Sequence, residues 1–349
     1  MRFLAVLLVI FLSFSLAECT VLAANPEKYD ILKLPECQVA TNSFGGKLLL
    51  SNSPEMVDQD GILYEDKVEG KIRLFIHHVN ASETSKRAVV ILENMSFDDA
   101  HVFVSCYGFG GPGYNWMAVG KEALSSYLAG NNSSSIRISS QFSIPLPASN
   151  NVLLPQMGVS GIFDLEIDQP ITIKVIMLPV LADEWTFSRQ APILPHDKNH
   201  LRGTFEGANR RITFSKDYDP NANCAIALTL ADNRIDLFLE GVDATDGSKV
   251  INYGNYGVVY QIFPNARENG RVAYYINPRG GDYAGVIRVK YQDSEQVLVD
   301  IPDGRLYFGE DKYKDFALLG VFENNEPLCF TFSPPGSSNL PIKMVMMPQ

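Results

Sequence analysis

The residues best suited to bind a ligand are aromatic side chains beside two glycine-rich turns. In the first half of the chain, Tyr114 and Trp116 follow the turn G-F-G-G-P-G, and in the second half Arg279, Asp282 and Tyr283 belong to the segment N-P-R-G-G-D-Y. An aromatic ring beside such polar groups can stack on a sugar ring while its neighbours hydrogen-bond the sugar hydroxyls, and binding residues concentrate on loops. These five residues are the predicted ligand-binding residues. The alternative is that their rings fill a core.

The chain carries no complete catalytic or phosphate-binding motif. Residues 158–161 read G-V-S-G, one residue short of the G-x-S-x-G nucleophile turn, and residues 108–113 lack the Lys-Ser/Thr of a phosphate-binding loop. No pair among the 40 acidic residues stands out as the two carboxylates of a glycoside hydrolase. Catalytic residues are therefore unknown, although a triad assembled from distant positions stays open.

The histidines and the Asx-rich segment do not form a recognisable metal motif. His77 and His78 are adjacent in a predicted strand, so their side chains point to opposite faces. His196 and His200 are four residues apart, but they lie in a proline-containing segment rather than on a helix. Residues 217–223 alternate oxygen ligands but lack the glycine and the glutamate of a calcium loop. The sequence predicts no metal site and no cofactor.

Two segments of the chain recur in the same order. Residues 173–179 read I-K-V-I-M-L-P, and residues 342–348 read I-K-M-V-M-M-P. Earlier in each half, residues 72–104 align with residues 258–289. Two ordered matches indicate that one domain is present twice.

Alternating apolar residues and closely spaced Gly, Asn, Asp and Pro clusters predict an all-β protein. We expect two tandem β-sandwich domains related by internal duplication, 25–190 and 191–349. The first domain has one short helix at 120–129, which ends at a glycine. Hairpins are expected at 74–93 and at 226–239. The continuous apolar run from Ala88 to Leu92 is typical of a strand that is buried on both faces.

Residues 1–24 have the features of a secretory signal peptide. Arg2 precedes an apolar run, and small residues follow it. A lipoprotein signal ending at Cys19 is the alternative, although Glu18 stands where that motif has a small residue. The predicted location is secreted or extracellular, with association to the cell envelope open.

The net charge of −11 limits the classes of partner that the protein can bind. An acidic chain without a basic run is poorly suited to nucleic acid, whose binding depends on neutralising phosphates. No stretch after the signal is long and apolar enough for a transmembrane segment. The expected partner is therefore an extracellular polymer or a surface protein. The sequence leaves the oligomeric state open.

Four cysteines remain after the predicted signal: Cys37, Cys106, Cys224 and Cys329. An even number outside the cytosol permits disulfides. The simplest scheme has one in each domain, Cys37–Cys106 and Cys224–Cys329, and buried free thiols are the alternative.

The segments D-G-I-L-Y-E-D-K-V-E-G-K-I-R-L-F (60–75) and N-P-R-G-G-D-Y-A-G-V (277–286) resemble uncharacterised secreted proteins of spore-forming, low-GC anaerobic bacteria. Some of those proteins carry a separate copper amine oxidase N-terminal-type module, which this chain lacks. The resemblance implies a secreted bacterial protein and assigns no catalytic residue.

These features together predict a secreted, non-catalytic binding or envelope-associated protein, with carbohydrate or a surface partner as its ligand. The alternative is a secreted hydrolase that acts on polysaccharide or peptidoglycan.

Overall fold

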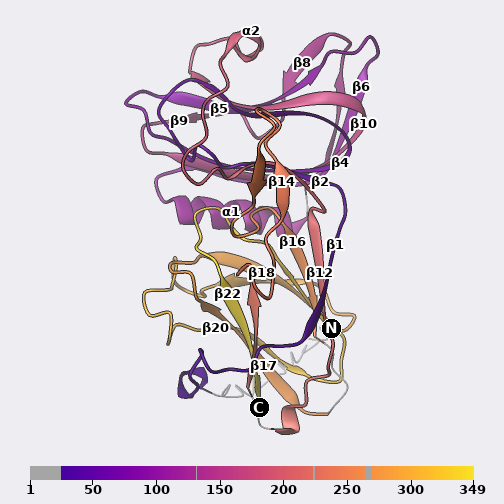
Figure 1. Ribbon diagram of the computed structural model, residues 1–349, viewed down its shortest axis with the longest axis vertical. Coiled ribbons are helices and arrows are strands. Elements are labelled where there is room, and N and C mark those ends of the chain that lie inside the picture. Colours follow the sequence, from indigo (N-terminus) through magenta and orange to yellow (C-terminus); the bar gives the residue numbers. More distant parts are fainter. Residues whose placement is uncertain (1–24, 131, 223–224, 265–268) are drawn as a thin grey trace, which may run out of the picture.

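A computed structural model describes residues 25–130, 132–222, 225–264 and 269–349 (Figure 1). The predicted signal peptide lies outside these residues. Strands form three sheets, and two α-helices and two short 3-10 turns (Pro26–Lys28 and Pro220–Ala222) complete the regular structure of the described part. The prediction of an all-β fold is confirmed.

The largest sheet has 12 strands. Its main path is β15 (Lys249–Ile251), β14 (Glu240–Val242), β11 (Arg202–Glu206), β2 (Lys47–Ser51), β4 (Gly61–Asn80), β10 (Gly158–Pro179), β5 (Lys86–Asn94) and β8 (Phe142–Pro145). Four further strands attach to this path: β3 (Met56–Val57) to β4, β6 (Ala100–Gly113) to β10, β7 (Ser134–Ile138) to β6, and β9 (Asn151–Leu153) to β5.

Two smaller sheets share one buried core in the lower part of Figure 1. The six-stranded sheet has the order β1 (Val39–Phe44), β12 (Asn209–Phe214), β16 (Val259–Phe263), β21 (Leu328–Phe332), β18 (Gly285–Tyr291) and β19 (Val297–Ile301). The four-stranded sheet has the order β13 (Ile226–Leu230), β22 (Ile342–Pro348), β17 (Arg271–Pro278) and β20 (Ala317–Glu323). Ile262 and Phe330 from the first sheet and Tyr274 and Met344 from the second belong to the same cluster.

Helix α1 (Trp116–Ala129) contacts β6 and β10 on one side and β18 on the other, between the upper and lower parts of Figure 1. The predicted end at Gly130 is confirmed, since this residue is left-handed with φ 70°. The helix starts earlier than predicted because the side chain of Asn115 accepts a hydrogen bond from the Ala118 amide. Glycines in β6 allow the close approach: a Cβ at Gly108 would lie 2.1 Å from the carbonyl oxygen of Ala123.

A second helix, α2 (Glu184–Gln190), lies at the end of the first predicted domain, where no helix was predicted. Phe187 of this helix packs against Val89 and Ile91 of β5, whereas Ala88 and Val90 face the main core of the sheet. The continuous apolar run of β5 is therefore buried on both faces, as predicted, and α2 covers one of them. The prediction of a single helix was wrong because a seven-residue helix leaves little periodicity in the sequence.

Both predicted hairpins were wrong. Strand β10 lies between β4 and β5 and pairs with each of them antiparallel. In the other case, β13 pairs with β22, and residues 231–239 form an irregular loop. Strands were correctly predicted at β4, β5 and β13, but the alternation predicted to continue to residue 239 was wrong, since Ile235 and Leu237 are exposed in the loop. An apolar pattern indicates the buried face of a strand and not its neighbour.

One strand from each half of the sequence pairs with a strand of the other half. β1 lies early in the chain but pairs with β12, and β11 lies late in the chain but pairs with β2. Gly45 and Gly207 follow these two strands directly, with φ of +90° and +79°, a backbone conformation that glycine adopts without strain. The sheets therefore join residues on both sides of the boundary predicted near residue 190.

The segments that match in sequence lie on paired strands in each half. Residues 173–179 of β10 pair antiparallel with β5, and residues 342–348 of β22 pair antiparallel with β17. Ile173 is opposite Leu92, and Ile342 is opposite Pro278. The two matched segments are thus neighbours in one sheet in each half.

The cysteines that the structure describes are free thiols. Cys37 is buried, and Cys106 and Cys329 are partly buried. Of the two alternatives, free thiols therefore hold for Cys37 and Cys106, and the Cys37 amide donates to the Ala227 carbonyl of the second half. Cys224 lies outside the described residues.

Candidate functional site

A cleft of about 540 Å³ opens where the start of α1 faces loops from both halves of the chain. We call it the Trp116 cleft. Its lining residues come from five separate segments: Asn52, Glu55, Tyr114, Asn115, Trp116, Met117, Asn199, Leu201, Tyr256, Ser337, Ser338 and Asn339.

Two of the predicted binding residues, Tyr114 and Trp116, line this cleft. Tyr114 is 62% exposed, and Trp116 is partly exposed. Trp116 is the first residue of α1, and its indole N–H donates to the carbonyl of Gln156 at 2.9 Å. The indole ring is therefore held in one orientation before any ligand arrives, which lowers the entropy cost of stacking on it.

Uncharged amide side chains surround the two rings. Asn52, Asn115, Asn199 and Asn339 all line the cleft. Asn52 is 5% exposed, and its side-chain oxygen is buried without a hydrogen-bond partner among the described residues. A buried carbonyl oxygen without a hydrogen-bond partner costs free energy.

No described residue of the N-P-R-G-G-D-Y loop, Arg279, Asp282 and Tyr283 included, lines the cleft, but the backbone of Asp282 holds Asn339, which does. The side-chain amide and the backbone amide of Asn339 both donate to the carbonyl of Asp282, at 3.1 and 2.9 Å. The Arg279 guanidinium instead donates to the Lys312 carbonyl and lies 5.1 Å from the ring centroid of Tyr313.

Tyr283 of the same loop is fully buried, and its ring packs edge-on against Phe308. It therefore presents no face to solvent. The two aromatic groups that the sequence suggested as binding loops thus differ: one lines a cleft, and the other fills the core.

A serine and a histidine meet beneath the cleft. The Ser337 hydroxyl lies 2.8 Å from Nε2 of His77, and an oxygen of Glu55 lies 3.8 Å from the same nitrogen. A catalytic triad requires a carboxylate on the other ring nitrogen, but Nδ1 of His77 has no partner among the described residues. Burial lowers the pKa of His77 to about 3, which makes it a weak base. The pair connects β4 to the loop before β22.

Glu55 is the one carboxyl group among the described residues that line the cleft. Burial raises its pKa, and the nearby charge of Asp197 raises it further. Glycoside hydrolysis uses two carboxyl groups that face each other, so Glu55 alone does not supply that chemistry. Sequence reasoning did not find Glu55, Ser337 or the amide side chains, because no local spacing connects these segments.

The two buried histidines of β4 predict a loss of stability in mild acid. Burial lowers the pKa of His77 to about 3 and that of His78 to about 4, from an ordinary value of 6.5. Below pH 6.5 the unfolded chain binds protons that the folded chain does not, so this stability is complete above pH 6.5 and declines as the pH falls. We expect a decline of about 1.4 kcal/mol per pH unit for each histidine.

Urea unfolding at several pH values between about 6.5 and about 4.5 measures this decline. His78→Gln should reduce the slope by about 1.4 kcal/mol per pH unit. His101→Gln is the matched control, because the His101 side chain is 62% exposed. Equal slopes in the wild type and in His78→Gln would contradict the prediction.

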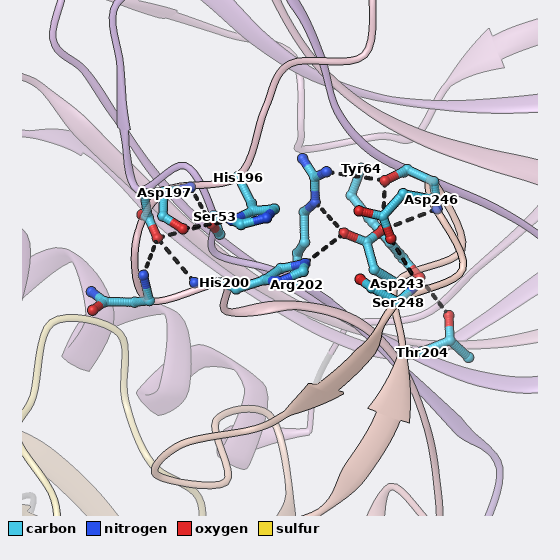
Figure 2. A network of polar contacts seen from close by, with 12 residues as sticks. Ser53, Tyr64, His196, Asp197, His200, Arg202, Thr204, Asp243, Asp246 and Ser248 are labelled. Carbon is cyan, nitrogen blue, oxygen red and sulfur yellow. Dashed lines mark hydrogen bonds and ion pairs between the residues drawn. The ribbon is translucent and has the colours of Figure 1, made fainter.

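A polar network adjoins the cleft (Figure 2). Asp197 accepts hydrogen bonds from the Ser53 hydroxyl and from the Glu55 amide, both at 3.0 Å. Further along the network, Asp243 is buried and accepts from Arg202 Nε at 2.6 Å. The network holds the cleft segment around Glu55 in place relative to β11.

The structure defines an all-β protein with an aromatic, amide-lined cleft between its halves. None of the helices in the described part is long and apolar enough to span a membrane. No protein-family model and no curated protein matches the chain.

Similar solved structures include a Paenibacillus xanthan lyase (8% identity, TM-score 0.19, covering 91% of this chain and 26% of that chain). Another is the tandem CBM22-1–CBM22-2 domain of Paenibacillus barcinonensis Xyn10C (7% identity, TM-score 0.16, covering 91% and 99%). This chain therefore spans about a quarter of the lyase. At these TM-scores the likenesses carry no argument about fold or function.

Proposed function

We propose that the protein binds carbohydrate in the Trp116 cleft without chemically changing it. The observation that carries the proposal is that the fixed Trp116 ring and the exposed Tyr114 ring share one cleft with the amide side chains of Asn52, Asn115, Asn199 and Asn339.

The chemistry of these side chains suits a sugar. Aromatic faces stack on the apolar C–H face of a pyranose ring, and amides donate to and accept from its hydroxyls. The unpartnered oxygen of Asn52 gives a hydroxyl donor a specific place to bind. With Glu55 as the one described carboxyl in the cleft, neutral sugars are favoured over acidic ones.

The predicted secretion of the protein is consistent with carbohydrate binding. The signal peptide predicted at residues 1–24 and the net charge of −11 suit a protein that meets polysaccharide outside the cell, free or as part of the envelope.

We also propose that the chain arose by duplication of one β-sandwich domain. The antiparallel pairing of β5 with β10 and of β17 with β22, the strands that carry the matched segments, supports this origin. So does one parallel pair at the start of each half, β2 with β4 and β12 with β16. The exchange of β1 and β11 between the halves is symmetric, as in a domain-swapped pair joined into one chain.

Trp116→Ala is expected to weaken oligosaccharide binding at least about tenfold, which corresponds to about 1.4 kcal/mol. A glycan array of neutral plant and bacterial oligosaccharides identifies the ligand, and titration calorimetry measures its affinity. Trp185→Ala is the matched control, because Trp185 is the other tryptophan of the chain, is 40% exposed and lies on α2 outside the cleft.

The control should bind like the wild type, and both variants should keep the wild-type circular dichroism spectrum. Unchanged affinity in Trp116→Ala and in Tyr114→Ala would contradict the site. An array on which the wild type binds no glycan would contradict the proposed function.

A further inference from the structure

We propose that His196, His200 and Asp246 form a binding site for a divalent transition-metal ion such as Zn²⁺. One ligand atom from each residue lies within 4.8 Å of the others. The two imidazole rings are parallel, with centroids 3.6 Å apart. Two nitrogen ligands of a tetrahedral zinc ion, each at about 2.0–2.1 Å from the metal, are separated by roughly 3.3 Å. The rings are therefore close enough to share one ion, but a metal lies in the plane of each imidazole that binds it, so the stacked rings must tilt out of their parallel arrangement when the ion binds.

Hydrogen bonds leave one nitrogen of each ring available to a metal. Nδ1 of His196 lies 2.7 Å from the carbonyl oxygen of Asp197, and Nε2 of His200 lies 2.9 Å from a carboxylate oxygen of Asp243. Each of these nitrogens therefore carries the proton in a neutral ring. The lone pairs are then on Nε2 of His196 and on Nδ1 of His200. A histidine that ligates a metal commonly donates its other N–H to an oxygen in this way.

The backbone that carries the histidines is fixed before any ion binds. The Asp197 carboxylate accepts from the amides of Asn199 and His200 at 2.9 and 3.2 Å, which closes the loop between the two histidines. His200 has φ +49°, an uncommon conformation for a residue with a side chain. The third ligand is also held in place, since Asp246 accepts from the Ser248 amide at 2.8 Å. Figure 2 shows this network.

The donor set favours a transition metal. Two imidazoles and one carboxylate suit zinc, which then takes a water as its fourth ligand, whereas calcium prefers oxygen ligands alone. The carboxylates of Asp243 and Asp246 and the guanidinium of Arg202 leave a net negative charge around neutral imidazoles. A bound ion would connect the segment before β11 to the turn between β14 and β15.

Titration calorimetry of the full chain with ZnCl₂, after EDTA treatment and dialysis, tests the site. We expect one Zn²⁺ per chain and a rise in Tm with zinc. His196→Ala and Asp246→Asn should each weaken zinc affinity at least tenfold. Both side chains are exposed, so the variants are expected to fold. His101→Ala is the matched control, because His101 is an exposed histidine that pairs with Asp168 away from the site.

Cobalt provides a second readout. Co²⁺ in place of Zn²⁺ should give the intense visible absorption of a four-coordinate ion in the wild type and in His101→Ala, and should lose it in His196→Ala. The proposal is overturned if the wild type binds no zinc. It is also overturned if His196→Ala and Asp246→Asn both bind zinc as tightly as the wild type.

Discussion

Replacing Arg73 by alanine is expected to lower the free energy of unfolding by about 3 kcal/mol, the lower end of the cost of breaking a buried ion pair, because the Asp164 side chain left behind is 27% exposed. The Arg73 side chain is 6% exposed. Its guanidinium donates to both carboxylate oxygens of Asp164, at 2.7 and 3.0 Å. It also donates to the carbonyl of Ala208 at 2.6 Å and to the side chain of Asn209 at 2.9 Å.

The position of Arg73 explains the size of this effect. Arg73 on β4 is paired directly with Asp164 on β10, and Ala208 and Asn209 lie where the chain passes from β11 to β12. One side chain therefore fixes the crossing point of the two halves. The Tyr127 hydroxyl of α1 donates to the same carboxylate at 2.7 Å. Without the guanidinium, the carboxylate and the Ala208 carbonyl would lose their strongest donor.

Lys71→Ala is the matched control for Arg73→Ala. Lys71 lies two residues away on the same strand and is paired with Glu166 of β10 in the same register. The Lys71 and Glu166 side chains are 74% and 51% exposed, and their charges are 3.3 Å apart. An exposed pair contributes at most about 1 kcal/mol. Urea unfolding followed by circular dichroism should show a clearly larger loss of unfolding free energy in Arg73→Ala than in Lys71→Ala. Equal losses of unfolding free energy in the two variants would contradict the prediction.

Asp236→Ala is expected to destabilise the second half by about 3–5 kcal/mol. Asp236 is 1% exposed and forms an ion pair with the buried Arg210. It also accepts from the Tyr260 hydroxyl and from the Ala231 amide, both at 2.7 Å. Its removal would leave the Arg210 charge buried and uncompensated and would release the loop at residues 231–239.

Two further variants are expected to be less destabilising than Asp236→Ala. Tyr260→Phe removes the hydrogen bond to the Asp236 carboxylate and the one that the Asn255 amide donates to the Tyr260 hydroxyl, and it should cost about 1.5–3 kcal/mol. Glu323→Ala is the control, because Glu323 pairs with Arg271 at 3.4 Å and both side chains are at least 39% exposed. The expected order of destabilisation in urea is Asp236→Ala, then Tyr260→Phe, then Glu323→Ala. If Asp236→Ala lowers the free energy of unfolding no more than Glu323→Ala does, the prediction is wrong and the buried network contributes little to stability.

Part of the candidate site could be read from the sequence. Tyr114 and Trp116 are close together in sequence and stay together at the mouth of one cleft. Asn52, Asn199 and Asn339 are far apart in the sequence, and nothing in their local spacing indicates that they meet. The same holds for the proposed metal ligands, because Asp246 follows His200 by 46 residues. Tyr283 shows the opposite case, in which an aromatic residue beside a polar turn is part of the core.

Three features were predicted correctly from the sequence alone: the all-β character of the fold, the end of α1 at Gly130 and the burial of β5 on both faces. These features depend on side-chain period and on local backbone preferences, which neighbouring residues carry. Three other features became visible only in three dimensions: β10 lies between β4 and β5, β1 and β11 each pair with a strand of the other half, and five segments line one cleft. Strands pair through backbone hydrogen bonds that are alike for every residue type, so the choice of partner depends on how all the buried faces pack at once.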